Sequence, residues 1–109
     1  MDRRAFSILL LAGFRLDMPG ILQPRTYGRD ISITRATEIA DTFEDPSEYI
    51  DEEILVNGIV LEVCEERGLW INVVDEGSRD YVMCVLDDKD YSFPRSAVGR
   101  VCSVQGTFN

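Results

Sequence analysis

The 109-residue chain contains no histidine. Without an imidazole it cannot build a Ser-His-Asp or Cys-His nucleophile pair, a His-Glu-x-x-His zinc helix or a Cys₂His₂ finger. Cysteine is scarce, with three residues, and no apolar run is long enough to cross a bilayer as a helix. The content of 45% hydrophobic and 28% charged residues is ordinary for one small globular domain. These absences exclude histidine-dependent catalysis and a multi-span membrane protein.

Basic residues are outnumbered by acidic ones, 11 against 20, which gives a net charge of −9. The imbalance is not uniform along the chain. Residues 1–35 hold six arginines and three acids, a local charge of +3, whereas residues 36–109 hold five basic and seventeen acidic side chains, a local charge of −12. An acidic body repels phosphate groups, so a nucleic-acid-binding function is disfavoured.

The N-terminus resembles a secretory signal peptide. Arg3 and Arg4 precede the apolar run Ala5–Phe14, in which Ser7 is the only polar side chain. A charged segment before 7–15 apolar residues is typical of a secretory signal. We therefore expect export to the periplasm or cell envelope, with any membrane contact made only by this segment. A short amphipathic or buried helix is the alternative for residues 1–20, and residues 21–29 are expected to be a tether.

The body, residues 30–109, is predicted to be mainly β. A short helix is expected over Thr37–Phe43, with Thr37 as N-cap and Pro46 ending it. Strands are expected over 54–64, 69–75, 80–86 and 101–108. Gly58 lies inside the long first strand, where a glycine often marks a bend that lets one strand serve two sides of a barrel. The pattern favours a small, partly open oligonucleotide/oligosaccharide-binding (OB) fold-like barrel of four to five strands, preceded by a short α-helix.

One strand is missing from this count. The alternating segment Asp30–Thr34 is the favoured candidate to complete the barrel, and a strand from a second copy is the alternative. A homodimer formed through the open barrel edge is therefore possible.

Residues Tyr27–Phe108 resemble domain of unknown function 4920, a family of small exported bacterial proteins. The resemblance lies in Val56-Asn57-Gly58-Ile59-Val60, Val63-Cys64, Gly68-Leu69-Trp70, Phe93-Pro94 and Gly99-Arg100-Val101. It implies an OB-like barrel in the periplasm or at the cell surface and brings no established activity. Leu69 stands where the family pattern has a second cysteine, so the family's Cys-x₄-Cys pair is reduced to Cys64.

The single tryptophan, Trp70, follows a glycine turn. We favour a core plug for it, and the alternative is a stacking platform for a flat ligand on the barrel face. Tyr81, Tyr91 and Phe93 would join Trp70 in the ligand-binding alternative, because OB barrels bind through one face and its bordering loops.

Three cysteines are an odd number for an exported chain, so at least one is expected to be free or paired between chains. Cys84 and Cys102 lie inside predicted strands and are expected to be small buried hydrophobes. Cys64, at a strand end beside a turn, is either buried in the same way or a weak metal ligand.

No spacing of residues singles out a catalytic set, so an enzyme is not predicted, and no cofactor is predicted. The favoured function is an exported binding module for a small ligand or a protein partner. A structural component of an envelope assembly, joined through strands, comes second. Binding of nucleic acid is a further alternative offered by the fold alone.

Overall fold

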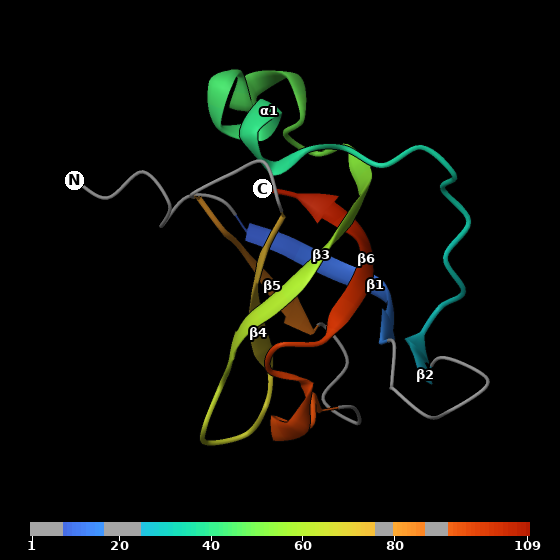
Figure 1. The fold of residues 1–109 in the computed structure, drawn as a ribbon. Helices are drawn as coiled ribbons and strands as arrows, with labels where there is room; N and C mark the ends of the chain where they lie inside the picture. Colours follow the sequence, from blue (N-terminus) through green and yellow to red (C-terminus); the bar gives the residue numbers. More distant parts are fainter. Residues whose placement is uncertain (1–7, 17–24, 76–79, 87–91) are drawn as a thin grey trace.

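The computed structural model describes residues 8–16, 25–75, 80–86 and 92–109. The strands are β1 (Ile8–Leu16), β2 (Arg25–Gly28), β3 (Glu53–Val63), β4 (Trp70–Val74), β5 (Val82–Leu86) and β6 (Val101–Phe108). The helical elements are α1 (Ile39–Glu44) and two short 3₁₀ helices, η2 (Pro46–Glu48) and η3 (Arg95–Ala97). Figure 1 shows α1 over one end of the strands and η3 at the opposite end.

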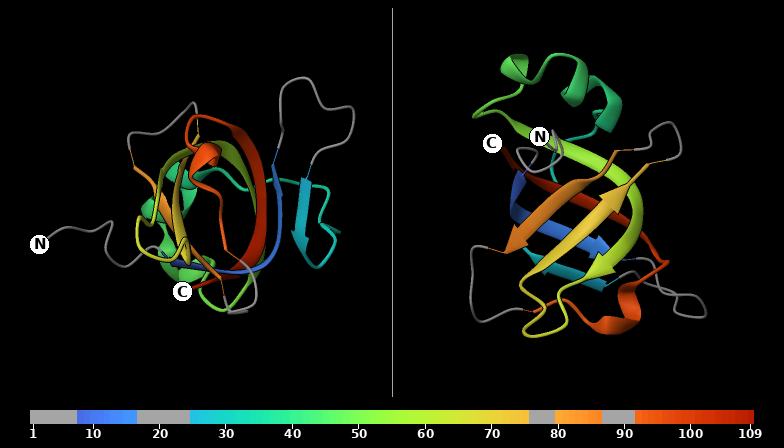
Figure 2. Two further views of the ribbon diagram at one scale, coloured as in Figure 1. Left: turned by 90° about the horizontal axis from the view of Figure 1, so that it is seen from below. Right: turned by 90° about the vertical axis from the view of Figure 1, so that its left-hand side faces the viewer.

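Five of these strands close into a barrel in the order β1-β5-β4-β3-β6, and β6 returns to β1. β1 runs parallel to β5, and every other barrel pairing is antiparallel. β2 pairs only with β1 and lies outside the ring (Figure 2). The predicted fold class, a mainly β and OB-like small barrel with a short helix, is confirmed. The helix, however, follows β1 and β2 in the chain, and β1 closes the barrel.

From Ile8 onward, where the structure describes it, the N-terminal apolar run is a strand and not a helix. Its inward-facing side chains Leu9, Leu11, Phe14 and Leu16 are between 0% and 7% exposed. The spacing changes after Leu11 because the pairing of β1 with β6 shifts register between Leu11 and Gly13. This bulge hides the alternation that identifies a half-buried strand. The predicted domain start at residue 30 is wrong, because the barrel begins with Ile8; export itself stays a prediction.

The segments expected to be a tether and a closing strand also differ from the prediction. Part of residues 21–29 forms β2. Asp30–Thr34 forms no strand: the backbone N–H groups of Ser32 and Ile33 donate to the side-chain Oε1 of Gln105, each at 2.9 Å. Gln105 is 2% exposed and also donates from Nε2 to Glu53 at 2.9 Å. The segment is thus held against the barrel wall by a buried amide rather than by a strand ladder.

β3 serves two neighbours, as Gly58 predicted. It pairs with β6 from Glu53 to Ile59 and with β4 from Ile59 to Val63. A Cβ at Gly58 would lie 2.5 Å from the carbonyl oxygen of Val74, so the close crossing of the two backbones requires glycine. Alternation from Ile59 to Leu61 ends at a bulge between Val60 and Glu62, which leaves Leu61 and Glu62 both exposed. Val63 is therefore buried, whereas Ile59 and Leu61 are exposed.

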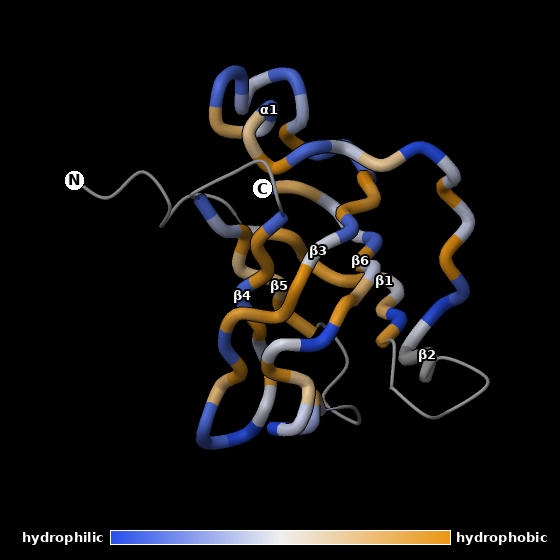
Figure 3. Tube along the Cα trace, in the orientation of Figure 1, coloured by the Kyte–Doolittle hydropathy of each residue, from blue (hydrophilic) through white to orange (hydrophobic). Residues whose placement is uncertain are grey.

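The core fills the barrel and its α1 end. α1 contributes Ile39 and Phe43, and Ala97 of η3 is buried at the opposite end. The α1 N-terminus is capped by Asp75, whose Oδ2 accepts from the Ile39 N–H at 2.8 Å, and not by Thr37. Figure 3 shows the hydropathy along the chain, with largely apolar strands and a mixture of polar and apolar residues in α1 and η2. The fully buried barrel side chains include Leu9, Leu16, Val56, Val60, Ile71, Val73, Val82, Cys84, Val104 and Phe108.

Candidate functional site

Trp70 lies on the outside of the barrel. Its neighbours Ile71 and Val73 are 0% exposed and belong to the core, so strand alternation directs Trp70, Asn72 and Val74 outward. Trp70 is half-buried and is not part of the core cluster. The favoured interpretation as a core plug is therefore wrong. The indole instead lies on an outer face of the barrel, as the alternative interpretation of a stacking platform requires.

This face is formed by the neighbouring strands β4 and β5, which cross the front of the right-hand view in Figure 2. We call it the β4–β5 outer face and define it by Trp70, Asn72, Val74, Met83 and Val85. Trp70 lies opposite Val85 in the register, and Asn72 lies opposite Met83. Directly opposed side chains are about 5 Å apart at Cβ, so Met83 and Val85 extend the apolar surface beside the indole.

Asn72 is the polar member of the β4–β5 outer face and is only 5% exposed. Its Nδ2 donates to Oε1 of Glu62 at 2.8 Å. Its Oδ1 is buried and has no hydrogen-bond partner. A buried acceptor without a donor costs about 1–3 kcal/mol relative to a paired one. The face therefore holds a carbonyl oxygen that an N–H or O–H group from outside the chain would satisfy.

The other predicted aromatic residues do not all reach this face. Tyr81 is half-buried and directly precedes β5, with a parity that matches Met83 and Val85. Tyr91 lies outside the described residues. Phe93 is 4% exposed and packs edge-on against Phe14, with ring centroids 4.8 Å apart. The prediction of Phe93 as a ligand contact is wrong, because its ring fills the core.

Phe93 does support the site indirectly through its backbone. The Phe93 N–H donates to the carbonyl of Gly68 at 2.7 Å, and this fixes the loop that carries the chain from β3 to Trp70. Gly68 has a φ of 64°, and a Cβ there would lie 2.5 Å from the Phe93 carbonyl oxygen. The glycine before Leu69-Trp70 is thus required by the conformation of this loop.

Cys64 begins the same loop and is partly exposed. Its own N–H donates to the carbonyl of Trp70 at 3.0 Å, which ties it to the start of β4. The backbone N–H of Arg67 lowers the pKa of the Cys64 thiol, with smaller effects from the following loop amides, against the opposing effect of desolvation. Such a thiol is more readily ionised than an ordinary cysteine.

Cys84 and Cys102 are 0% and 2% exposed, so the prediction that they are small buried hydrophobes is confirmed. Burial raises the pKa of Cys84 well above its ordinary value and that of Cys102 to about 12. All three cysteines are free thiols. Among the described residues, no group of three or more cysteine or acidic side chains is placed to hold a metal ion.

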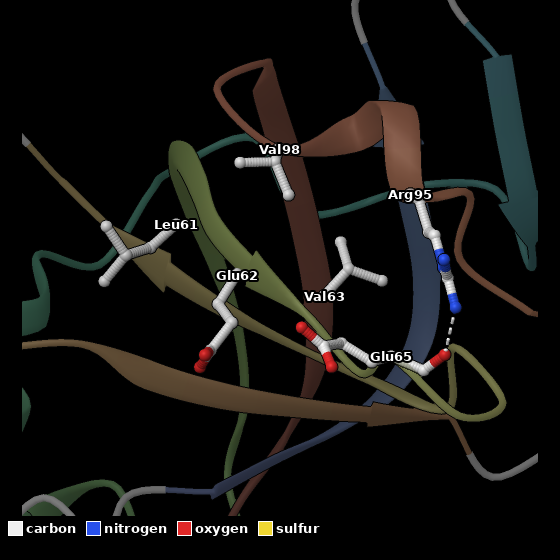
Figure 4. Close-up of a pocket in the computed structure, with 6 residues that line it drawn as sticks. All are labelled: Leu61, Glu62, Val63, Glu65, Arg95 and Val98. Carbon is white, nitrogen blue, oxygen red and sulfur yellow. Dashed lines mark hydrogen bonds between the residues drawn. The ribbon is translucent and has the colours of Figure 1, made fainter.

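A separate surface pocket of about 370 Å³ lies beside the end of β3. Leu61, Val63 and Val98 form its apolar walls, and Glu62, Glu65 and Arg95 line it with charge. In Figure 4 the Arg95 guanidinium points to the Glu65 backbone carbonyl, to which it donates at 2.6 Å. The Glu62 carboxylate belongs to both regions, because it lines the pocket and accepts from Asn72.

Asn72 could have been identified from the sequence as a candidate site residue, although the predicted site was chosen from aromatic residues. Asn72 is the single polar side chain in Ile71-Asn72-Val73-Val74, where strand alternation places it beside Trp70 on one face. Asn72 lies opposite Glu62 and donates to it only because a bulge in β3 shifts the register, and residue types do not predict a bulge.

The geometry defines a small closed OB-like β-barrel with an outer face that carries a half-buried indole and an unpaired buried amide oxygen. Comparison of the chain with family models, curated proteins and solved structures finds no match. Within the described residues, no helix is long and apolar enough to cross a membrane.

Proposed function

We propose that this barrel is a binding module that holds a small planar ligand on the β4–β5 outer face. The observation that carries the proposal is the Asn72 Oδ1 atom, which is buried and lacks a donor two residues from a half-buried tryptophan on the same face. Residues i and i+2 of a strand are roughly 7 Å apart, so a ring system stacked on the indole spans the distance to Asn72. Because Asn72 Oδ1 is buried, a side chain beside it must shift for the ligand's donor to reach this oxygen.

The charge of the surroundings narrows the ligand class. Glu62 lies next to Asn72 and is exposed, so it disfavours an anionic ligand and favours a neutral or cationic one. The ligand must also carry an N–H or O–H donor for Asn72. A neutral or cationic aromatic heterocycle with a ring N–H or an exocyclic amine satisfies both conditions. Single-stranded nucleic acid is disfavoured, because none of the five residues of this face is basic.

The location of the site agrees with the general behaviour of OB barrels, which bind through one outer face and its neighbouring loops. This agreement is a fold-level analogy. Export to the periplasm or cell envelope, and kinship with domain of unknown function 4920, stay predictions from the sequence.

The test is a titration of intrinsic fluorescence with a set of small aromatic heterocycles that includes aminopyrimidines and aminopurines. Trp70 is the only tryptophan, so quenching reports directly on the proposed site. We expect at least one compound to quench Trp70 saturably, and we expect oligothymidylate at low salt to leave the emission unchanged.

The decisive variant is Asn72→Leu. It removes an unpaired acceptor, so the ligand-free protein should be at least as stable as wild type, whereas affinity for the quenching compound should fall about tenfold or more. Asn57→Leu is the matched control, because the Asn57 Oδ1 already accepts from Ser103 at 2.7 Å on β3. Equal binding by Asn72→Leu and wild type would refute the proposal.

A further inference from the structure

A second surface, which meets the β4–β5 outer face at Glu62, carries four exposed apolar side chains. They are Ile59 at 39%, Leu61 at 53%, Val98 at 52% and Val101 at 53% exposed, and we call them the β3–β6 patch. Ile59 and Val101 are directly opposed in the register of β3 and β6. Leu61 and Val98 both line the 370 Å³ pocket. Large apolar side chains gathered in this way commonly mark an interaction site on a soluble domain.

The backbone holds the two halves of this patch together. The Val60 N–H donates to the Arg100 carbonyl at 2.9 Å, and the Gly99 N–H donates to the Val60 carbonyl at 2.8 Å. These two bonds clamp the segment that follows η3 against β3, between the exposed Ile59 and Leu61. The patch is thus a fixed surface, which reduces the conformational entropy that this chain would lose when a partner docks.

The charge at the pocket end of the patch is mainly negative. Glu62 and Glu65 line the pocket, and neither forms an ion pair within the part of the chain that the structure describes, where Arg29 pairs with Glu53. Arg95 is directed to the Glu65 backbone carbonyl rather than to a carboxylate. The chain as a whole adds a long-range negative field from its net charge of −9.

We infer that this surface docks an extended segment of a partner protein that presents a lysine or arginine between apolar side chains. The aliphatic stem of the basic residue would lie along Leu61 and Val98, with its charged end at Glu62 and Glu65. The flanking apolar residues would cover Ile59 and Val101. Charge complementarity selects this partner over an acidic or nucleic-acid one. The inference does not depend on a ligand at Trp70.

The probe is a fluorescein-labelled peptide with the core Val-Ser-Lys-Ser-Leu. Alternate residues of an extended chain point to the same side, so the valine, lysine and leucine can all face the barrel. The comparison peptide replaces lysine with norleucine, which keeps the stem and removes the charge. Binding is followed by fluorescence anisotropy of the label, which is independent of Trp70 quenching.

Two variants with matched controls test the residues. Val98→Asp should weaken the lysine peptide at least tenfold, whereas Ile50→Asp, at a site 47% exposed and outside the patch, should change it less than twofold. Glu65→Gln should weaken it about threefold and reduce its salt dependence, whereas Glu66→Gln, outside the pocket lining, should not. None of these substitutions touches the β4–β5 outer face, so heterocycle binding at Trp70 should be unaffected by all four.

The result expected is tighter binding of the lysine peptide than of the norleucine peptide, with loss of binding in Val98→Asp. Equal binding of the two peptides, or equal effects of Val98→Asp and Ile50→Asp, would overturn the inference. So would sedimentation showing that the wild-type chain dimerises and that Val98→Asp makes it monomeric, because the patch would then be covered by a second copy.

Discussion

Truncation of Phe14 to alanine tests whether the N-terminal apolar run is part of the fold. Phe14 is 1% exposed on β1 and packs edge-on against Phe93 at 4.8 Å. Replacing the ring with a methyl group removes on the order of 120 Å² of buried apolar area, or about 3 kcal/mol at ~25 cal/mol per Å². The cavity left behind and the lost ring contact bring the expected cost to about 3–5 kcal/mol.

That loss is a large share of the total stability, which is about 5–15 kcal/mol for a typical domain. Urea unfolding followed by far-ultraviolet circular dichroism should therefore show a midpoint shifted down by roughly 2 M. Leu10→Ala is the matched control, because Leu10 lies on the same strand but is 43% exposed. Its expected cost is below about 1 kcal/mol.

If the apolar run acts only as an address that precedes the folded domain, the two substitutions will have the same small effect. A loss below about 1 kcal/mol for Phe14→Ala would therefore refute the assignment of Ile8–Leu16 to the barrel.

Three further outcomes follow from the thiols and the buried amide. Iodoacetamide at neutral pH should add one carbamidomethyl group per native chain, at Cys64, because backbone amides lower the pKa of that thiol while Cys84 and Cys102 are buried. Intact-mass measurement of the wild type and of Cys64→Ser checks this prediction. Two or more additions to the native chain would contradict it. The free energy of unfolding should fall as pH rises from about 9 to about 12, because the folded chain keeps the Cys102 proton that the unfolded chain loses. Cys102→Ala should flatten this decline. An unchanged slope in Cys102→Ala would contradict the raised pKa of the buried Cys102 thiol. Gln105→Ala should lower the free energy of unfolding by about 1–3 kcal/mol and speed tryptic cleavage at Arg35, because the Ser32 and Ile33 N–H groups lose their acceptor. A cleavage rate equal to that of the wild type would show that the Gln105 amide does not hold residues 30–34.

The body of the barrel could be predicted from sequence because its strands carry strong local signals. The strands that became β3, β4, β5 and β6 were found within two residues at each end, since β-branched runs are separated there by glycine and acidic turns. The helix before Pro46 was found for the same local reason.

The closing strand could not be predicted, because its register depends on distant partners. Ile8–Leu16 is nearly all apolar, and the bulge after Leu11 breaks its alternation, so its local pattern equals that of a signal segment. Asp30–Thr34 alternates like a strand, but its N–H groups bond to the Gln105 side chain, which lies more than 70 residues away.

The candidate site was predictable only in part. Trp70 was identified, but the sequence does not show which of the alternating side chains of β4 face the core. The structure shows that Ile71 and Val73 are buried there, so Trp70 faces outward. Phe93 lies in a loop of the sequence and was therefore predicted to contact a ligand. Its burial could not be predicted, because it depends on contact with Phe14 of β1, a strand that the sequence did not reveal.

The pairing of β1 with β6 also fixes when the molecule can fold during synthesis. Leu9 lies opposite Phe108, and Leu16 lies opposite Cys102, so β1 meets this partner only after residues 102–108 have been synthesised. Until that partner emerges, the apolar side of β1 has no closed barrel in which to be buried. While the residues between β1 and β6 are synthesised, β1 is therefore exposed as an apolar segment, and any factor that competes with the barrel for it must act before β6 is complete.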